Sequence, residues 1–256
     1  MKRPVIIVGM GEMGGVFARG FLKAGYPVYP ALRNDDLWQL SDQIEAPELV
    51  LLAVAEKDFD SAAKRIPAPW RDKLVLLQNE LLPGDWQRHN LDAPTVISVW
   101  FEKKPGMDFK VLVPSPVRGP RANSVAEALG SLGIPFTIID NEADMLFELV
   151  RKNMYIVTTN VCGLETGGTV SELWRDNAEI MNRVFDDVLA VQQALTHKDF
   201  NRNDLLSAVL TAFDGDPDHK CMGRSAPQRL QRALEQAAAA ELEVPALQEI
   251  SEKTQK

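Results

Sequence analysis

One stretch decides the fold: Val5-Ile6-Ile7-Val8-Gly9-Met10-Gly11-Glu12-Met13-Gly14, in which a short apolar run leads into the pattern G-x-G-x-x-G. A predicted helix over residues 16–24 follows, and this pattern between a strand and a helix is typical of a dinucleotide-binding loop, with an ordinary glycine-rich turn as the alternative. Gly9 allows the tight turn, Gly11 lets a pyrophosphate approach the backbone, and Gly14 lets the helix sit close to the strand. The helix N-terminus favours the anion through its free N–H groups and partial positive charge. We therefore expect phosphate binding by Gly9, Met10, Gly11, Glu12, Met13 and Gly14.

The end of the next predicted strand selects between the two nicotinamide dinucleotides. A strand that binds NAD usually ends in Asp or Glu, which accepts a hydrogen bond from the ribose 2′-hydroxyl. The strand predicted over residues 28–32 is followed by Arg33, whose guanidinium can hold a 2′-phosphate through two parallel hydrogen bonds. NADP is therefore favoured. Asp35 and Asp36 come next, and NAD becomes the alternative if either carboxylate turns inward.

The two halves of the chain differ in their predicted secondary structure. Seven short apolar runs alternate with helical patterns in the first half, over residues 5–8, 28–32, 49–54, 74–77, 96–99, 111–113 and 136–139. Apolar runs separated by helices predict a mainly parallel sheet that is covered on both faces. Strand signals end near residue 140. We expect an α/β protein with a doubly wound Rossmann domain over residues 1–141 and an all-helical domain over residues 142–256.

Capping signals divide the second half into helices. Asn141, with Asp144 three residues later, can cap a helix, and Thr169 with Glu172 matches a capping box. Four helices are predicted, over residues 141–160, 169–197, 203–213 and 225–243. Residues 251–256 are expected to be a frayed tail.

Composition excludes several classes of protein. Hydrophobic residues make up 45% and charged residues 25% of 256, which is inconsistent with a disordered chain, a collagen or a disulfide-stapled mini-protein. The 28 basic and 36 acidic residues give a net charge of −8 without a basic tract, so we expect neither nucleic acid nor a membrane as partner. No apolar run approaches the roughly 20 residues of a membrane span. Cys162 and Cys221 lie far apart, which favours a reduced, cytoplasmic location.

Three further segments carry recognisable patterns. An apolar strand over residues 52–54 leads to Lys57 and an aromatic residue, and residues 75–79 form a strand that ends in Gln-Asn. The helix predicted around residues 151–160 places Lys152 and Asn160 eight residues apart. Together with the glycine pattern and Arg33, these segments resemble the ketopantoate reductase (2-dehydropantoate 2-reductase) family, within the enzymes similar to 6-phosphogluconate dehydrogenase. The resemblance covers most of the chain.

The resemblance implies an NADPH-dependent reduction of a small 2-keto acid. By position, Lys152 is the general acid that protonates the carbonyl oxygen, Asn79 contacts both nicotinamide and substrate, and Lys57 lies in the cofactor site. A cationic donor suits this chemistry because hydride addition leaves negative charge on that oxygen. Asn79 and Lys152 are thus the catalytic candidates. The substrate-binding candidates are Asn79, Lys152, Thr159, Asn160, Ser207 and Asp218.

This chain departs from the family pattern at three places. Glu80 replaces the glycine after Asn79, Ile156 replaces the middle asparagine of the helix, and Asp218 stands in for a late glutamate after a register slip of about two residues. We therefore expect the reaction type to be retained with a substrate other than ketopantoate. Two alternatives stay open: a non-catalytic NADP(H)-binding sensor, and a β-hydroxyacid dehydrogenase that prefers oxidation.

Metal chemistry is not expected. His89, His197 and His219 share no spacing typical of a metal site or a catalytic triad, so we interpret them as structural or surface residues. The acidic residues between 214 and 218 resemble part of a calcium loop but are not followed by the bidentate glutamate that such a loop needs. The oligomeric state stays open, with a homodimer as one option.

Overall fold

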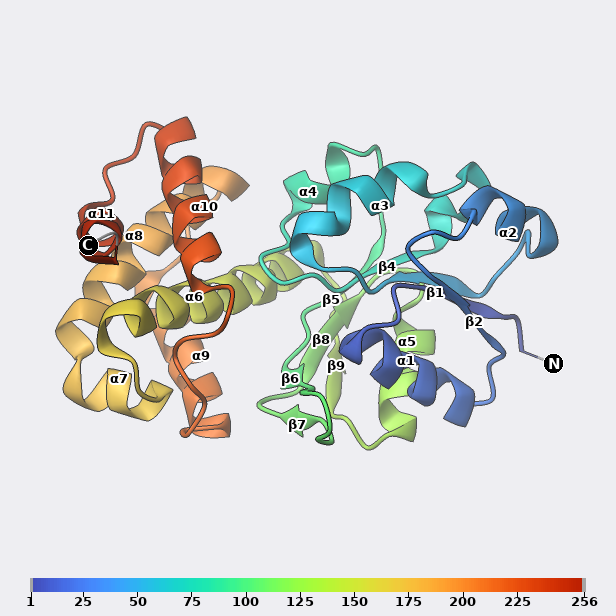
Figure 1. Ribbon diagram of the computed structural model, residues 1–256, viewed down its shortest axis with the longest axis horizontal. Helices are drawn as coiled ribbons and strands as arrows, with labels where there is room; N and C mark the ends of the chain where they lie inside the picture. Colours follow the sequence, from blue (N-terminus) through green and yellow to red (C-terminus); the bar gives the residue numbers. More distant parts are fainter. Residues whose placement is uncertain (1, 255–256) are drawn as a thin grey trace. The chain divides into compact units, whose positions relative to one another are not determined.

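A seven-stranded sheet organises the N-terminal part of the protein, seen in a computed structural model that describes residues 2–254 (Figure 1). The strand order is β2-β1-β3-β4-β5-β8-β9, and every neighbouring pair is parallel except β5 and β8. The strands are β1 Val5–Val8, β2 Val28–Ala31, β3 Leu49–Leu52, β4 Leu74–Leu76, β5 Thr95–Ile97, β8 Ser115–Arg118 and β9 Phe136–Ile138. The predicted α/β class with a mainly parallel sheet is confirmed.

Helices cover both faces of this sheet (Figure 1). One face carries α1 (Glu12–Lys23) and α5 (Ala122–Ser131), and the other carries α2 (Leu37–Gln43), α3 (Phe59–Arg65) and α4 (Pro83–Gln87). Strands β1 and β3 are therefore buried along their whole length, as their unbroken apolar sequence predicts. Gly20 brings α1 and α5 close together, since a Cβ there would lie 2.7 Å from the carbonyl oxygen of Ala128.

Near residue 115, one predicted strand lies outside the large sheet and one strand of that sheet was not predicted. The run over residues 111–113 does not join the large sheet, because β7 (Lys110–Val111) pairs with β6 (Phe101–Glu102) in a separate hairpin. The large sheet instead contains β8, which we did not predict because Pro116 argues against a strand. The sheet tolerates Pro116 there, since its carbonyl still accepts from Ser98 N–H (2.9 Å).

The C-terminal part is helical, as predicted. The chain divides into two compact units after Glu148, a residue inside α6. The sequence predicted the boundary between residues 141 and 142. The helices are α6 Glu142–Thr166, α7 Val170–Asp176, α8 Ala178–Thr196, α9 Arg202–Gly215, α10 Ala226–Ala239 and α11 Pro245–Thr254. Among residues 2–254, no helix combines the length and the apolar character that crossing a membrane requires.

Capping side chains explain where two of these helices begin, but they do not explain every helix end. Asn141 accepts from Asp144 N–H (2.8 Å), and Thr169 forms the predicted capping box with Glu172. The helix after Thr169 nevertheless stops at Asp176, and α8 starts anew. We also missed α11, although a proline at its first position is typical of a helix start. Residues 251–254, expected to fray, belong to α11, and residues 255–256 lie outside the described residues.

Helix α6 is longer than predicted because it continues through Gly163. A Cβ at this position would lie 2.8 Å from the backbone nitrogen of Met222 and 2.9 Å from the carbonyl carbon of Cys221. The glycine therefore serves close packing of the segment around Cys221 against the helix. Gly167 and Gly168, both with positive φ, end the helix as expected.

Replacing Glu241 by glycine is expected to stabilise the helical unit. Glu241 has φ of 55° at the end of α10, where its N–H donates to Ala238 and Leu242 N–H donates to Ala237, the Schellman pattern that favours glycine. Removing the Cβ from a left-handed residue should raise the free energy of unfolding by about 1 kcal/mol. Urea denaturation measures this, and Glu243→Gly, at a residue without positive φ, is the control. A lower stability of Glu241→Gly would contradict the interpretation.

Candidate functional site

The three glycines after β1 have three distinct geometric roles. Gly9 has φ of +96°, its N–H donates to Ala31 (3.0 Å), and a Cβ on it would lie 2.6 Å from the Ala53 carbonyl oxygen. A Cβ on Gly14 would lie 2.1 Å from the Gly9 carbonyl oxygen, so α1 can start against the turn only with glycine there. Within residues 2–254, no heavy atom would lie within 4 Å of a Cβ on Gly11. The loop thus has the tight turn, the close helix and the open backbone of a pyrophosphate cradle.

A cavity of about 250 Å³ adjoins this loop and is lined by Met10, Gly11, Glu12, Gly15, Val16, Arg19 and Lys103. Gly11 is the N-cap residue of α1 and has no side chain with which to cap the first-turn N–H groups. These N–H groups and the positive end of the helix favour an anion in the cavity. The geometry therefore fits the phosphate site predicted from the sequence.

Two cations at this cavity were missed by sequence reasoning. Lys103 follows β6, and its Nζ lies 2.9 Å from Glu12 Oε2 with 19% of the side chain exposed. Arg19 lies on α1, with Nη2 3.2 Å from Asp108 Oδ1. Neither residue belongs to a motif, and the hairpin that carries Lys103 lies far along the chain from the glycine pattern. No local signal could have placed it there.

The turn after β2 contains the residues that bear on the choice of dinucleotide. Arg33 is exposed, and its Nη2 lies 3.2 Å from Asp58 Oδ2. The Asp35 carboxylate accepts from Leu32 N–H (2.7 Å), and the Asp36 carboxylate caps α2 by accepting from its first-turn N–H groups. One oxygen of each carboxylate is therefore engaged with nearby backbone, and the exposed Arg33 guanidinium is suited to a ribose substituent that carries a phosphate.

The ends of β3 and β4 are joined by Gln78. Its buried amide donates to the carbonyl oxygens of Leu52 (2.6 Å) and Val54 (3.3 Å). Asn79 follows at a half-buried position, and Glu80 has φ of 59°. Glu80, which stands where the family pattern has glycine, therefore still has a left-handed backbone conformation. Lys57 is exposed in the short 3-10 helix Glu56–Asp58.

Lys152 lies on α6 in a half-buried position within the helical unit. Its Nζ is 5.8 Å from the centroid of the Tyr155 ring, and that ring also packs against Phe213 (5.6 Å) and His219 (6.1 Å). The attraction of an ammonium to a ring face at this distance favours a defined direction for the Lys152 side chain. The helix thus gives Lys152 an ordered setting.

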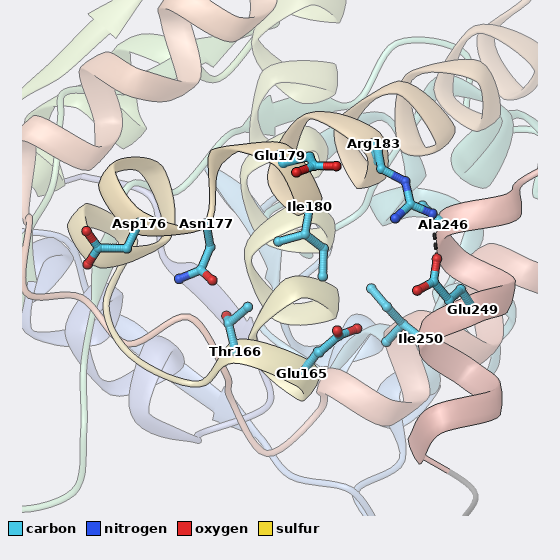
Figure 2. Close-up of a pocket in the computed structure, with 10 residues that line it drawn as sticks. All are labelled: Glu165, Thr166, Asp176, Asn177, Glu179, Ile180, Arg183, Ala246, Glu249 and Ile250. Atoms are coloured by element: carbon cyan, nitrogen blue, oxygen red, sulfur yellow. Dashed lines mark hydrogen bonds and ion pairs between the residues drawn. The ribbon is translucent and has the colours of Figure 1, made fainter.

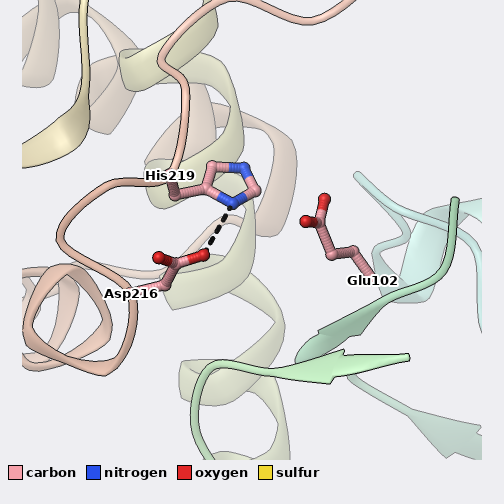
Figure 3. Close-up of side chains that lie close together, drawn as sticks. All are labelled: Glu102, Asp216 and His219. Atoms are coloured by element: carbon pink, nitrogen blue, oxygen red, sulfur yellow. Dashed lines mark ion pairs between the residues drawn. The ribbon is translucent and has the colours of Figure 1, made fainter. Parts of the chain in front are cut away.

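The buried carboxylate after α9 is Asp216, while Asp218, our candidate, is exposed. The Asp216 side chain is 5% exposed, and its Oδ2 lies 3.6 Å from Nδ1 of His219 (Figure 3). His219, which we interpreted as structural or surface, therefore joins Tyr155 to a buried acid. Only the tertiary structure distinguishes Asp216 from its neighbours, because three aspartates alternate in this segment.

The other substrate candidates differ in what they contact. Thr159 is buried, and its hydroxyl donates to the Tyr155 carbonyl oxygen one turn earlier (2.7 Å). The Asn160 amide donates to the Cys221 carbonyl oxygen (3.1 Å) and accepts from Arg229 Nη1 (2.8 Å). Ser207 is exposed on α9. Thr159 and Asn160 thus make contacts within the helical unit itself.

The two cysteines have no features of a catalytic nucleophile. Both are fully buried, and burial raises the pKa of both thiols, that of Cys221 to about 11. They are therefore protonated at neutral pH, whereas the thiolate is the reactive form.

A second cavity, of about 290 Å³, lies within the helical unit (Figure 2). Part of its charged lining is paired, since Glu249 contacts Lys253 and Arg183, and Lys253 also contacts Glu165. These two cations lower the pKa of the Glu249 carboxyl to about 2. Because Arg183, the one cation among the described residues that line it, is already paired with Glu249, we interpret this cavity as a packing feature of the helices.

No protein-family model matches the chain, and no curated protein matches its sequence. Solved structures do match it over its full length. A 2-dehydropantoate 2-reductase from Methylococcus capsulatus has a TM-score of 0.70 at 13% identity, with 98% of this chain and 96% of that chain covered. A ketopantoate reductase from Ralstonia eutropha has a TM-score of 0.67 at 17% identity, with complete coverage of both chains.

D-mandelate dehydrogenase, in a complex with NADH and anilino(oxo)acetate, is also similar. Its TM-score is 0.66 at 12% identity, with 100% of this chain and 97% of that chain covered. At these identities the likeness establishes the fold. The resemblance stated from the sequence is thus confirmed as a structural match to ketopantoate reductases.

Proposed function

We propose that the protein is an NADP(H)-dependent oxidoreductase that reduces a small 2-keto acid. The observation that carries this proposal is the glycine turn, where two glycines remove backbone clashes and the third leaves open space beside a cavity that suits an anion. The fold supports it, since ketopantoate reductases and a D-mandelate dehydrogenase share it. Bound NADPH would supply the hydride.

The dinucleotide-binding residues in this proposal are those of the glycine loop, with Arg33, Lys57 and Asn79. The N–H groups at the start of α1 hold the pyrophosphate, and Arg33 binds the 2′-phosphate in exchange for its contact with Asp58. The exposed guanidinium of Arg33 after β2 supplies the cation that a 2′-phosphate needs, which supports NADP over NAD.

Lys152 is the proposed proton donor, and Asn79 orients the reacting groups. An ammonium stabilises the negative charge that develops on the carbonyl oxygen and then transfers its proton to that atom. We assign the buried Asp216, with His219, to the carboxylate role that we first assigned to Asp218. Ser207, Thr159 and Asn160 stay substrate candidates, and the last two have internal hydrogen bonds that hold them on α6.

Selectivity for the dinucleotide tests the cofactor assignment. Arg33→Met should weaken NADPH binding about 10- to 100-fold and leave NADH binding nearly unchanged, because a hydrogen bond to a charged group contributes about 1.5–3 kcal/mol. Fluorescence titration of both dinucleotides measures this, with the exposed Lys23→Met as the control. Tighter binding of NADH than of NADPH by the unaltered protein would contradict the assignment, as would equal weakening of both in Arg33→Met.

A further inference from the structure

Arg65 contacts the turn that carries Arg33. It is the last residue of α3, and its guanidinium donates through Nη1 to the carbonyl oxygen of Arg33 (2.9 Å) and through Nη2 to that of Asp35 (2.6 Å). These two carbonyls lie on either side of residue 34. A single planar side chain therefore fixes two points of the turn backbone, a task that suits the fork geometry of arginine.

The same segment also holds the Arg33 side chain. Asp58, which precedes α3, accepts from Arg33 Nη2 at 3.2 Å. Strands β2 and β3 flank β1 on opposite sides, so the segment after β3 reaches past the end of β1 to hold the turn after β2. Arg65 thereby holds the carbonyl of Arg33, and Asp58 contacts its exposed guanidinium.

The turn has two more anchors of its own. Asp35 accepts from Leu32 N–H, and Asp36 caps α2. The Arg33 side chain itself is 82% exposed and lacks packing that would order it. An exposed arginine that must be ordered on binding loses affinity through side-chain and loop entropy, and a backbone fixed beforehand reduces this loss.

We propose that Arg65 is a positioning residue for recognition of the 2′-phosphate: it holds the backbone of the β2–α2 turn so that Arg33 meets a ligand phosphate when it leaves Asp58. The proposal rests on the assignment of this turn to the NADP adenosine. It predicts that replacing Arg65 weakens the binding of ligands with a 2′-phosphate selectively. A general structural role would instead change the affinity for every adenosine ligand alike.

Isothermal titration calorimetry with adenosine 2′,5′-bisphosphate and with 5′-AMP separates these roles. Arg65→Met should weaken binding of the bisphosphate about three- to tenfold, because the turn is no longer preorganised, and should change the affinity for 5′-AMP less than about twofold. The bisphosphate affinity of Arg65→Lys should fall between those of the wild type and Arg65→Met, because an ammonium reproduces the positive charge without the planar fork. Lys64→Met removes a charge from the adjacent exposed residue of α3 and should leave the ratio of the two affinities unchanged.

The outcomes distinguish this inference from the function it rests on. If Arg65→Met weakens binding of both ligands equally, or if neither Arg65 variant weakens binding of the bisphosphate, the positioning role is overturned. The cofactor assignment still holds in that case if Arg33→Met loses the preference for the bisphosphate. A wild-type protein without preference for the bisphosphate overturns the cofactor assignment and the inference together. Circular dichroism and the melting temperature of each variant establish that it is folded.

Discussion

Lys152→Ala is expected to lower kcat for reduction of the best 2-keto acid by about 10²–10⁴-fold, the usual contribution of a positioned general acid. The variant loses both the charge that stabilises the developing oxyanion and the proton that neutralises it. NADPH affinity should stay within about twofold of wild type, because the proposed role involves the substrate oxygen. The absorbance of NADPH at 340 nm measures the rate, and fluorescence titration measures the affinity.

Two further variants sharpen this prediction. Lys152→Arg keeps a positive charge but cannot give up a proton at neutral pH, so it should recover binding of the keto acid with little of the rate. Lys198→Ala, at an exposed position of the same unit, should behave like wild type. Unchanged kcat/KM in Lys152→Ala would remove this residue from the chemistry.

Gly14→Ala is expected to abolish tight dinucleotide binding. The new Cβ would lie 2.1 Å from the Gly9 carbonyl oxygen, a distance that forces α1 away from the turn. The N–H groups that face the pyrophosphate then lose their positions, and the loss of about two charge-assisted hydrogen bonds lowers affinity by about 100-fold or more. NADPH and NADH should weaken alike, since both contain the pyrophosphate.

Gly130→Ala is the matched control for this substitution. It places a Cβ in another helix of the same unit, 3.5 Å from the Phe136 ring, which is an ordinary contact. It should bind both dinucleotides like wild type. If Gly14→Ala also binds NADPH with wild-type affinity, the glycine turn does not serve as the phosphate cradle.

Local patterns predicted the parts of the fold that local interactions determine. The bounds of β1 and the caps at Asn141 and Thr169 depend on apolar runs and on side chains a few residues away, and the structure confirms them. Strand β8 depends instead on pairing with β5 and β9, which overrides the proline. The passage of α6 through Gly163 depends on the segment near Cys221, which lies far along the chain.

The candidate site shows the same division. The glycine turn and Arg33 could be found from the sequence because motif and spacing are local. Lys103 and Arg65 could not be found in this way, since each contacts a residue in a segment far from it along the chain. The backbone contact of Asp35 and the burial of Asp216 follow from the folded backbone. The sequence alone therefore left the first undecided and offered Asp218 as the substrate carboxylate. The domain limits, the cytoplasmic location and the homodimer stay predictions.

Turnover by the unaltered protein tests the central claim most directly. NADPH consumption should be followed with a panel of 2-keto acids that vary in size and polarity, with identification of the product. We predict oxidation of NADPH with at least one of them and formation of the corresponding 2-hydroxy acid in equal amount. Tight binding of NADPH without turnover of any keto acid would contradict the account and support a non-catalytic sensor.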